Sequence, residues 1–89
     1  MQVLNLVRMK IPHQYRPGFR DVLVIQPLLA HSIEVEVWAG GHLLDRLVLV
    51  PGRLRIYDLV GIPADACIRL EVVEEDCHRK GEQHVYFID

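Results

Sequence analysis

The chain has 89 residues, of which 51% are hydrophobic, and its 10 Lys and Arg against 12 Asp and Glu give a formal net charge of −2. This length predicts a single domain, residues 1–89, only just large enough to sustain its own core. The basic residues are scattered among acidic ones, which argues against a nucleic-acid partner, because such binding depends on grouped cations. Eight of the ten basic residues are Arg, a bias that favours a protein-contact surface.

The N-terminal sequence and the two cysteines bear on localisation. Residues 1–8 have no basic leader, and their apolar run is too short for a signal peptide or a membrane span, so cytoplasmic synthesis is expected. Cys67 and Cys77 are expected at opposite ends of one strand, about 30 Å apart, well beyond the ~7 Å limit between Cα atoms in a disulfide. Two free thiols are therefore predicted.

Residues 2–11 are predicted to form the first strand, and they are apolar on both sides. Val7 and Met9 face one way, whereas Leu4 and Leu6 face the other. A strand of this kind is either central in its sheet or covered by another chain. Leu4 and Leu6 are therefore candidate interface residues.

The next two segments are a loop and a buried strand. Residues 13–18 contain a Pro-Gly turn signal and two residues suited to protein contacts, Tyr15 and Arg16. Residues 22–25 form a continuous apolar run bounded by turn residues. Such a run is typical of a strand that is buried on both faces.

Residues 33–39 show the clearest local pattern. Apolar residues alternate strictly with polar ones, which places Val35 and Val37 toward the core and Trp38 on the opposite, polar side. The Gly-Gly pair at 40–41 can take the positive φ that a two-residue hairpin turn requires, so a β-hairpin is predicted.

The return strand of this hairpin, residues 42–50, is less regular. Direct pairing across the turn would place Glu36 opposite Asp45, and facing like charges destabilise a sheet. A bulge at Asp45 and Arg46 would relieve the repulsion and would turn Leu47 and Leu49 to the core side.

A corner and a third strand follow. Pro51 and Gly52 cannot continue the ladder of hydrogen bonds, so the chain is expected to turn there. The alternation that resumes predicts an inward Leu54 and Ile56, and an outward Arg53, Arg55 and Tyr57.

The C-terminal third completes an all-β pattern. Residues 67–74 alternate with Ile68, Leu70 and Val72 inward, residues 74–82 are a charged, solvated turn, and residues 85–88 are the last strand. About seven short strands without a helical period predict one antiparallel β-sandwich with Greek-key connections.

The middle and end of the chain resemble the middle, or plug, domain of outer-membrane fimbrial ushers. That family has a small turn, a Val-x-Pro-Gly-x-Phe-x-Ile-x-Asp-Leu run and a strand closing on Glu-x-Asp-Gly. Arg53, Leu54 and Cys77 stand where the family has Pro, Phe and Gly. The resemblance covers about half the chain and implies a β-sandwich module used in a larger assembly. The matching positions are Gly41, Leu49, Pro51, Gly52, Leu54, Ile56, Asp58, Leu59, Ile68, Leu70, Val72, Glu74 and Asp76.

Reactive residues do not form a recognisable constellation. Cys77, His78 and His84 match no zinc spacing, so neither a metal nor another cofactor is expected. Ser32 is the only Ser in a chain without Thr, and adjacency to His31 does not create the geometry of an activated nucleophile. The chain is therefore predicted not to be an enzyme.

Trp38 is the strongest candidate for a contact residue. It lies on the polar side of its strand, where it gains nothing from the domain core, and exposed aromatic residues near Arg are the usual anchors of protein contacts. The alternative is that its ring lies flat on its own sheet or under a loop.

These observations predict a non-enzymatic structural subunit of a larger assembly, either a homo-oligomer or a complex with other protein subunits. The specific hypothesis is a phage virion component, such as a capsid decoration, tail or baseplate accessory protein. Two alternatives are a plug-like module of pilus assembly and a carbohydrate-binding sandwich with Trp38 and Tyr57 as stacking platforms. The interface candidates are Trp38, Tyr57, Arg53, Arg55, Tyr15, Arg16, Leu4 and Leu6.

Overall fold

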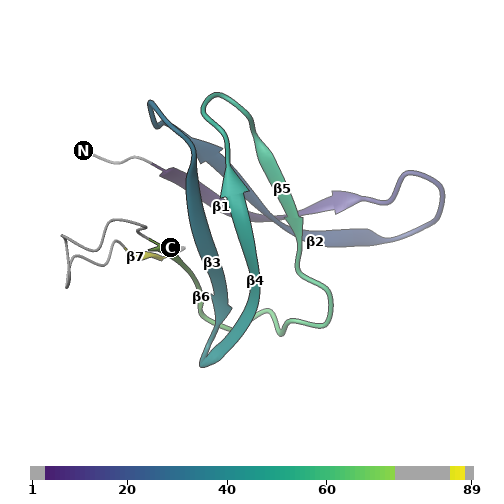
Figure 1. Ribbon diagram of the computed structural model, residues 1–89. Helices are drawn as coiled ribbons and strands as arrows, with labels where there is room; N and C mark the ends of the chain where they lie inside the picture. The colour runs from purple at the N-terminus through teal and green to yellow at the C-terminus, as the bar shows by residue number, and fades with distance from the viewer. Residues whose placement is uncertain (1–3, 74–84, 88–89) are drawn as a thin grey trace.

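The computed structural model describes residues 4–73 and 85–87 as two antiparallel sheets packed face to face (Figure 1). The order of strands in sheet A is β1 (Leu4–Pro12), β2 (Phe19–Pro27) and β5 (Arg55–Asp58). The order in sheet B is β4 (His42–Leu49), β3 (Ile33–Ala39), β6 (Ile68–Val73) and β7 (Val85–Phe87). The predicted all-β sandwich is confirmed. The predicted charged turn at 74–82 lies outside the described residues.

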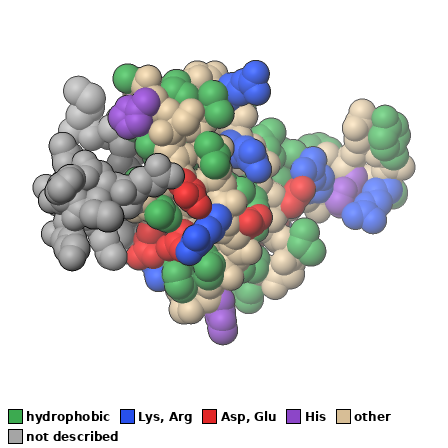
Figure 2. Space-filling view, viewed as in Figure 1, with side chains coloured by type: hydrophobic (Ala, Val, Ile, Leu, Met, Phe, Trp, Pro, Cys, Tyr) green, Lys and Arg blue, Asp and Glu red, His purple; other side chains and the backbone are tan. Residues whose placement is uncertain are grey.

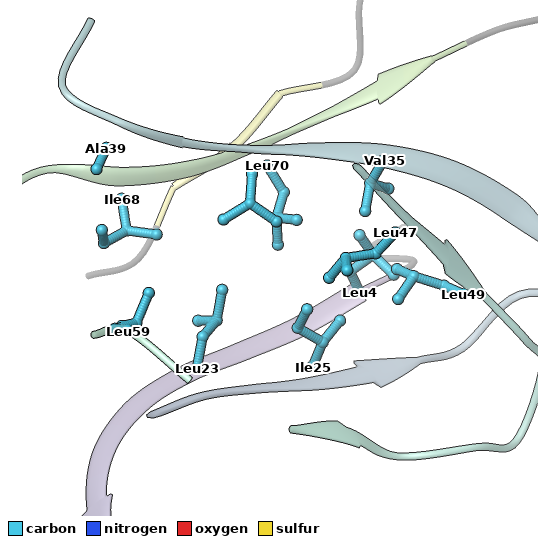
Figure 3. Packing of buried hydrophobic residues seen from close by; sticks show 11 residues of the cluster. Leu4, Leu23, Ile25, Val35, Ala39, Leu47, Leu49, Leu59, Ile68 and Leu70 are labelled. Carbon is cyan, nitrogen blue, oxygen red and sulfur yellow. The ribbon is translucent and has the colours of Figure 1, made fainter. Parts of the chain in front are cut away.

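The core lies between the two sheets, where one face of each contributes aliphatic side chains (Figure 3). These residues come from positions two apart along each strand, as the period of a β-strand requires. Helices long and apolar enough to cross a membrane do not occur in the described part of the chain. The buried cluster comprises Leu4, Leu23, Ile25, Val35, Val37, Ala39, Leu47, Leu49, Leu59, Ile68 and Leu70.

The β3–β4 hairpin forms as predicted, with Ala39 opposite His42 and a φ of 59° at Gly40. A bulge is present, but it lies one residue before the predicted place. Val37 pairs with Asp45 and Trp38 pairs with Leu43, which leaves Leu44 as the extra residue. The shift brings Glu36 opposite Arg46 instead of Asp45, so a repulsive pair is replaced by an attractive one.

The prediction of which β5 side chains face the core was wrong. Leu54 and Ile56 are 59% and 48% exposed, whereas Tyr57 packs against the core. Pairing with β2 sets this phase, because Tyr57 lies opposite Leu23, whose side chain faces the core. Leu54 and Ile56 compete with Tyr57 and Leu59 for the inward side, so the pattern of this short segment alone does not decide between the two phases.

The β1–β2 hairpin is the longest paired element of the fold. Its register runs without a shift from Leu4 opposite Pro27 to Pro12 opposite Phe19. Only the central part of β2 is also paired with β5. The end of the hairpin that carries the loop 13–18 therefore extends past β5 as two strands alone (Figure 1). The loop 13–18 therefore forms the tip of a projecting two-stranded ribbon, closed by a hydrogen bond from the His13 N–H to the Gly18 carbonyl.

Candidate interaction surface

The outer face of sheet B carries charged side chains of both signs. Glu36 on β3 forms an ion pair with Arg46 on β4 at 3.0 Å, and Arg69 on β6 lies 3.6 Å from Glu71. Figure 2 shows acidic and basic side chains side by side over β3 and β4. Partly exposed pairs of this kind add little stability, but they keep a sheet face hydrated.

Trp38 lies on this charged face, and its ring is covered by a cation from the neighbouring strand. The guanidinium carbon of Arg69 is 4.9 Å from the ring centroid, and its Nη1 donates a 2.6 Å hydrogen bond to the Gly40 carbonyl. This arrangement is a cation–π contact. The ring is half-buried and its Nε1 is enclosed without a hydrogen-bond partner among the described residues. Trp38 therefore lies against its own sheet rather than standing free as an anchor.

The outer face of sheet A is apolar at its centre. The register aligns Val7, Val24 and Ile56 in one row across the three strands, and it aligns Met9 with Val22 in the next row. Ile11 extends the same side of β1. We call these residues the apolar face, which consists of Val7, Met9, Ile11, Val22, Val24 and Ile56.

The apolar face is accessible to solvent at its margins. Val7 is 52% exposed and Met9 is 44% exposed, whereas Val22 between the two flanking strands is fully buried without belonging to the core cluster. Polar groups occupy the two ends of the face. Asn5 donates a 3.2 Å hydrogen bond to Gln26 at one end, and Arg20 pairs with Asp58 at 2.6 Å at the other. Contiguous apolar surface with a polar rim is typical of a contact site.

Two of the predicted interface residues on β1 face the wrong way. Leu4 is fully buried in the core, and Leu6 is half-buried against it. The prediction that β1 is apolar on both sides is confirmed, but the side that remains exposed carries Val7 and Met9. Tyr57 is likewise an inward residue, and burial, with a smaller contribution from Asp45, raises the pKa of its phenol.

The other predicted candidates are exposed. Tyr15 is 91% exposed at the hairpin tip, with Arg16 beside it, and Arg53 before β5 and Arg55 at its first position are also exposed. Phe19, which sequence reasoning did not select, is 66% exposed at the end of the hairpin. Its position directly after a Pro-Gly turn is the sequence signal that could have identified it.

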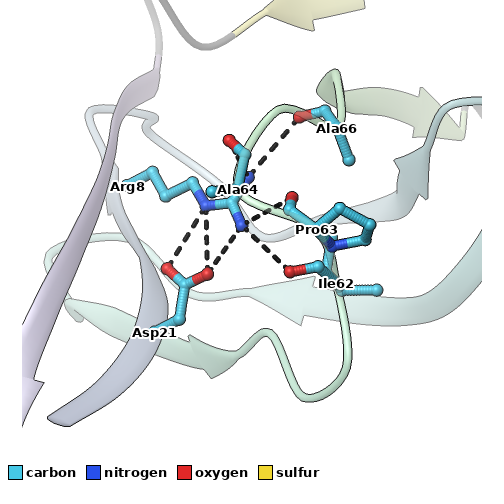
Figure 4. Close-up of polar contacts among 6 residues, drawn as sticks. All are labelled: Arg8, Asp21, Ile62, Pro63, Ala64 and Ala66. Carbon is cyan, nitrogen blue, oxygen red and sulfur yellow. Dashed lines mark hydrogen bonds and ion pairs between the residues drawn. The ribbon is translucent and has the colours of Figure 1, made fainter.

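Arg8, in the middle of β1, connects the β1–β2 hairpin to the segment between β5 and β6 (Figure 4). Its Nη2 lies 2.6 Å from the Asp21 carboxylate and its guanidinium also donates to the carbonyls of Ile62, Pro63, Ala64 and Ala66 at 3.1 to 3.4 Å. The hydrogen bond from Arg8 lowers the pKa of Asp21, and the same bond raises the pKa of Arg8. One side chain thus fixes the β5–β6 connection against the hairpin.

An open groove of about 640 Å³ lies between this connection and the hairpin, and it is lined in part by Arg16, Phe19 and Val60. Both of its carboxylates are engaged, Asp21 by Arg8 and Asp58 by Arg20. A base beside an activated nucleophile is not found in its lining.

Candidate metal and catalytic residues do not come together in the described ranges. Residues 4–73 and 85–87 contain no group of three His, Cys, Asp or Glu side chains placed to hold a metal ion. Cys67 is a free, exposed thiol. His31 and Ser32 are both exposed in the connection before β3. Cys77, His78 and His84 lie outside the described residues.

Comparisons with known proteins add no relative to this description. Neither a family model, nor a curated protein, nor a solved structure matches the chain. The resemblance to the usher plug domain therefore stays a prediction from sequence. What the fold and the surface define is a class: a small antiparallel β-sandwich with one charged and one apolar outer face.

Proposed function

We propose that the chain is a non-enzymatic structural subunit of a larger protein assembly and that the apolar face of sheet A is its contact surface. The observation that carries the proposal is the alignment of Val7, Val24 and Ile56 across three hydrogen-bonded strands, where Val7 is 52% exposed and Ile56 is 48% exposed. Transfer of apolar surface out of water is worth about 25 cal/mol per Å², so such a face favours a partner.

The hairpin tip offers a second contact region in the same subunit. Tyr15 and Phe19 are exposed aromatic residues, and Arg16 lies between them in sequence. Tyr and Arg are enriched in the residues that dominate binding energy at interfaces. The virion context proposed from the sequence, a capsid decoration, tail or baseplate accessory protein, is the assembly we would test first.

The carbohydrate-binding alternative loses its platform in this structure. Tyr57 packs on the inner face of sheet A and Trp38 lies on the outer face of sheet B beneath Arg69. Sheet B therefore lies between the two aromatic rings, and they cannot stack on the same sugar.

The test measures the size of the native particle. Extract from the cells that produce the chain, or from the particles that contain it, is fractionated by size-exclusion chromatography. The chain is detected with an antibody. We expect elution well above the monomer position for the wild type and a shift toward the monomer for Val7→Lys. Val48→Lys is the matched control, because Val48 is 58% exposed on the charged sheet. Wild-type elution as a monomer would contradict the proposal.

A further inference from the structure

We propose that the occupant of the apolar face is a second copy of this chain, packed sheet to sheet about a two-fold axis. This inference rests on the proposed function and deepens it, because it names the partner of that surface. Pairs of sheets commonly pack through their apolar faces about 10 Å apart, which is how the two sheets of this domain already meet.

The charges on the face favour a second copy over a foreign partner. Among the outward positions that the pairings of β1, β2 and β5 define, Arg20 and Asp58 are the charged residues, and they neutralise each other at 2.6 Å. A partner selected by charge would need a patch of one sign, and the face has none. A face of zero net charge that carries both signs suits contact with its own copy, because two-fold interfaces bring identical surfaces together.

The ends of the face determine the orientation of the axis. A two-fold axis that lies between the sheets and perpendicular to the strands reverses the strand direction. It places Arg20 of one copy over Gln26 of the other, whose amide can accept from the guanidinium while Asn5 already donates to it. The same operation places Val7 of one copy over Met9 of the other on β1, and Ile56 over Asp58 on β5, where Arg20 already neutralises the carboxylate.

The size of the face predicts a weak dimer. Strands about 4.8 Å apart with about 3.3 Å per residue, nine residues in each of β1 and β2 and four in β5, give a projected area of roughly 350 Å² for each copy. The total of about 700 Å² is below the roughly 1,200–2,000 Å² that is usual for stable complexes. Dissociation in the micromolar range or weaker is therefore expected, and the measurements need to extend to about 500 μM.

The experiment is sedimentation equilibrium on the purified full chain and on three variants: Val7→Lys, Met9→Glu and, as the control, Val48→Lys. We expect a monomer–dimer equilibrium for the wild type and for Val48→Lys. Both substitutions on the apolar face bury a charge in the contact, so each is expected to weaken dimerisation at least tenfold. Circular dichroism checks that every variant is folded.

Mixing the two charged variants tests the orientation. Because Val7 of one copy lies over Met9 of the other, an equimolar mixture of Val7→Lys and Met9→Glu is expected to form more dimer than either variant alone. A monomeric wild type at 500 μM, an undisturbed Val7→Lys dimer or a mixture without recovery would each overturn the inference. If the purified chain is monomeric while the native extract still shows a large particle sensitive to Val7→Lys, the second copy is excluded and the proposed function stands with a foreign partner.

Discussion

The two sheets of this sandwich share one core but present different outer faces. On sheet B, the outward side of β3 carries Glu34, Glu36 and Trp38, and cross-strand ion pairs and the Arg69 side chain cover it. On sheet A, the outward side of β2 carries Val22 and Val24, flanked by Val7 and Met9 of β1. The strand that alternates cleanly thus belongs to the sheet with the charged outer face, whereas the strand with an unbroken apolar run belongs to the sheet with the apolar outer face.

The largest effect that separates the two sides of sheet A is expected for Leu23→Ala. Leu23 is fully buried in the core, so its truncation leaves a cavity and is expected to lower the free energy of unfolding by about 2–5 kcal/mol. Ile56→Ala, on the half-exposed outer side, is expected to cost less than about 1 kcal/mol in the monomer. Urea denaturation at low protein concentration measures both, and equal losses would contradict the assignment of the two faces.

Arg8→Ala is expected to have the next largest effect. It leaves Asp21 and the carbonyls of the β5–β6 connection without their donor, at a cost of about 1–3 kcal/mol at neutral pH. Because the folded-state pKa of Asp21 is lowered, its pairing stabilises the fold above the unfolded pKa of about 3.9 and is lost as the pH falls.

The measurement for Arg8→Ala is therefore the difference in stability from the wild type at pH 7 and at about pH 3. We expect the difference to narrow in acid without vanishing, because the hydrogen bonds to backbone carbonyls do not titrate. Arg8→Lys is the control, since it retains the charge but lacks the planar fork of donors. A pH-independent difference would show that the carboxylate contributes little.

A smaller effect is expected for Arg69→Ala on sheet B. Loss of the cation over the Trp38 ring is expected to cost about 0.5–1 kcal/mol. The single Trp of the chain also provides a direct readout, because its fluorescence emission should shift to longer wavelength as the ring meets water. Arg69→Lys should retain most of the covering, and an unchanged emission maximum in Arg69→Ala would contradict the contact.

The smallest effect sharpens the comparison between the two outer faces. Val48→Lys is expected to change the free energy of unfolding by less than about 0.5 kcal/mol, because it adds a cation opposite Glu34 on a face that is already charged. The monomer should bind an apolar fluorescent dye through sheet A, so dye binding should fall in Val7→Lys and persist in Val48→Lys. Equal loss in both variants would show that the dye does not distinguish the faces.

Local sequence patterns predicted correctly those strands that have one face exposed to solvent. The alternation in residues 33–39 and the Gly-Gly turn were sufficient for the β3–β4 hairpin and for the existence of a bulge. The sequence analysis placed Tyr57 outward and chose Leu4 as an interface candidate, whereas both pack in or against the core, because apolar residues on alternate sides of a segment give no local signal for its orientation.

Contacts between distant parts of the chain were also beyond local patterns. The covering of Trp38 by Arg69 and the engagement of Asp21 by Arg8 depend on which strands become neighbours. The apolar face shows the same limit, since the sequence indicated that β1 and β2 were each doubly apolar, but only the register showed that their outer residues meet in one surface.

In the proposed dimer, the projecting β1–β2 ribbons would determine how the two subunits bind a further partner. With the strand direction reversed between two copies, their ribbons leave at opposite ends and carry Tyr15 of each to a separate place. In the proposed dimer, binding at one tip would raise the local concentration of the other tip near its own site, so a target with repeated sites would be bound more tightly than one with a single site.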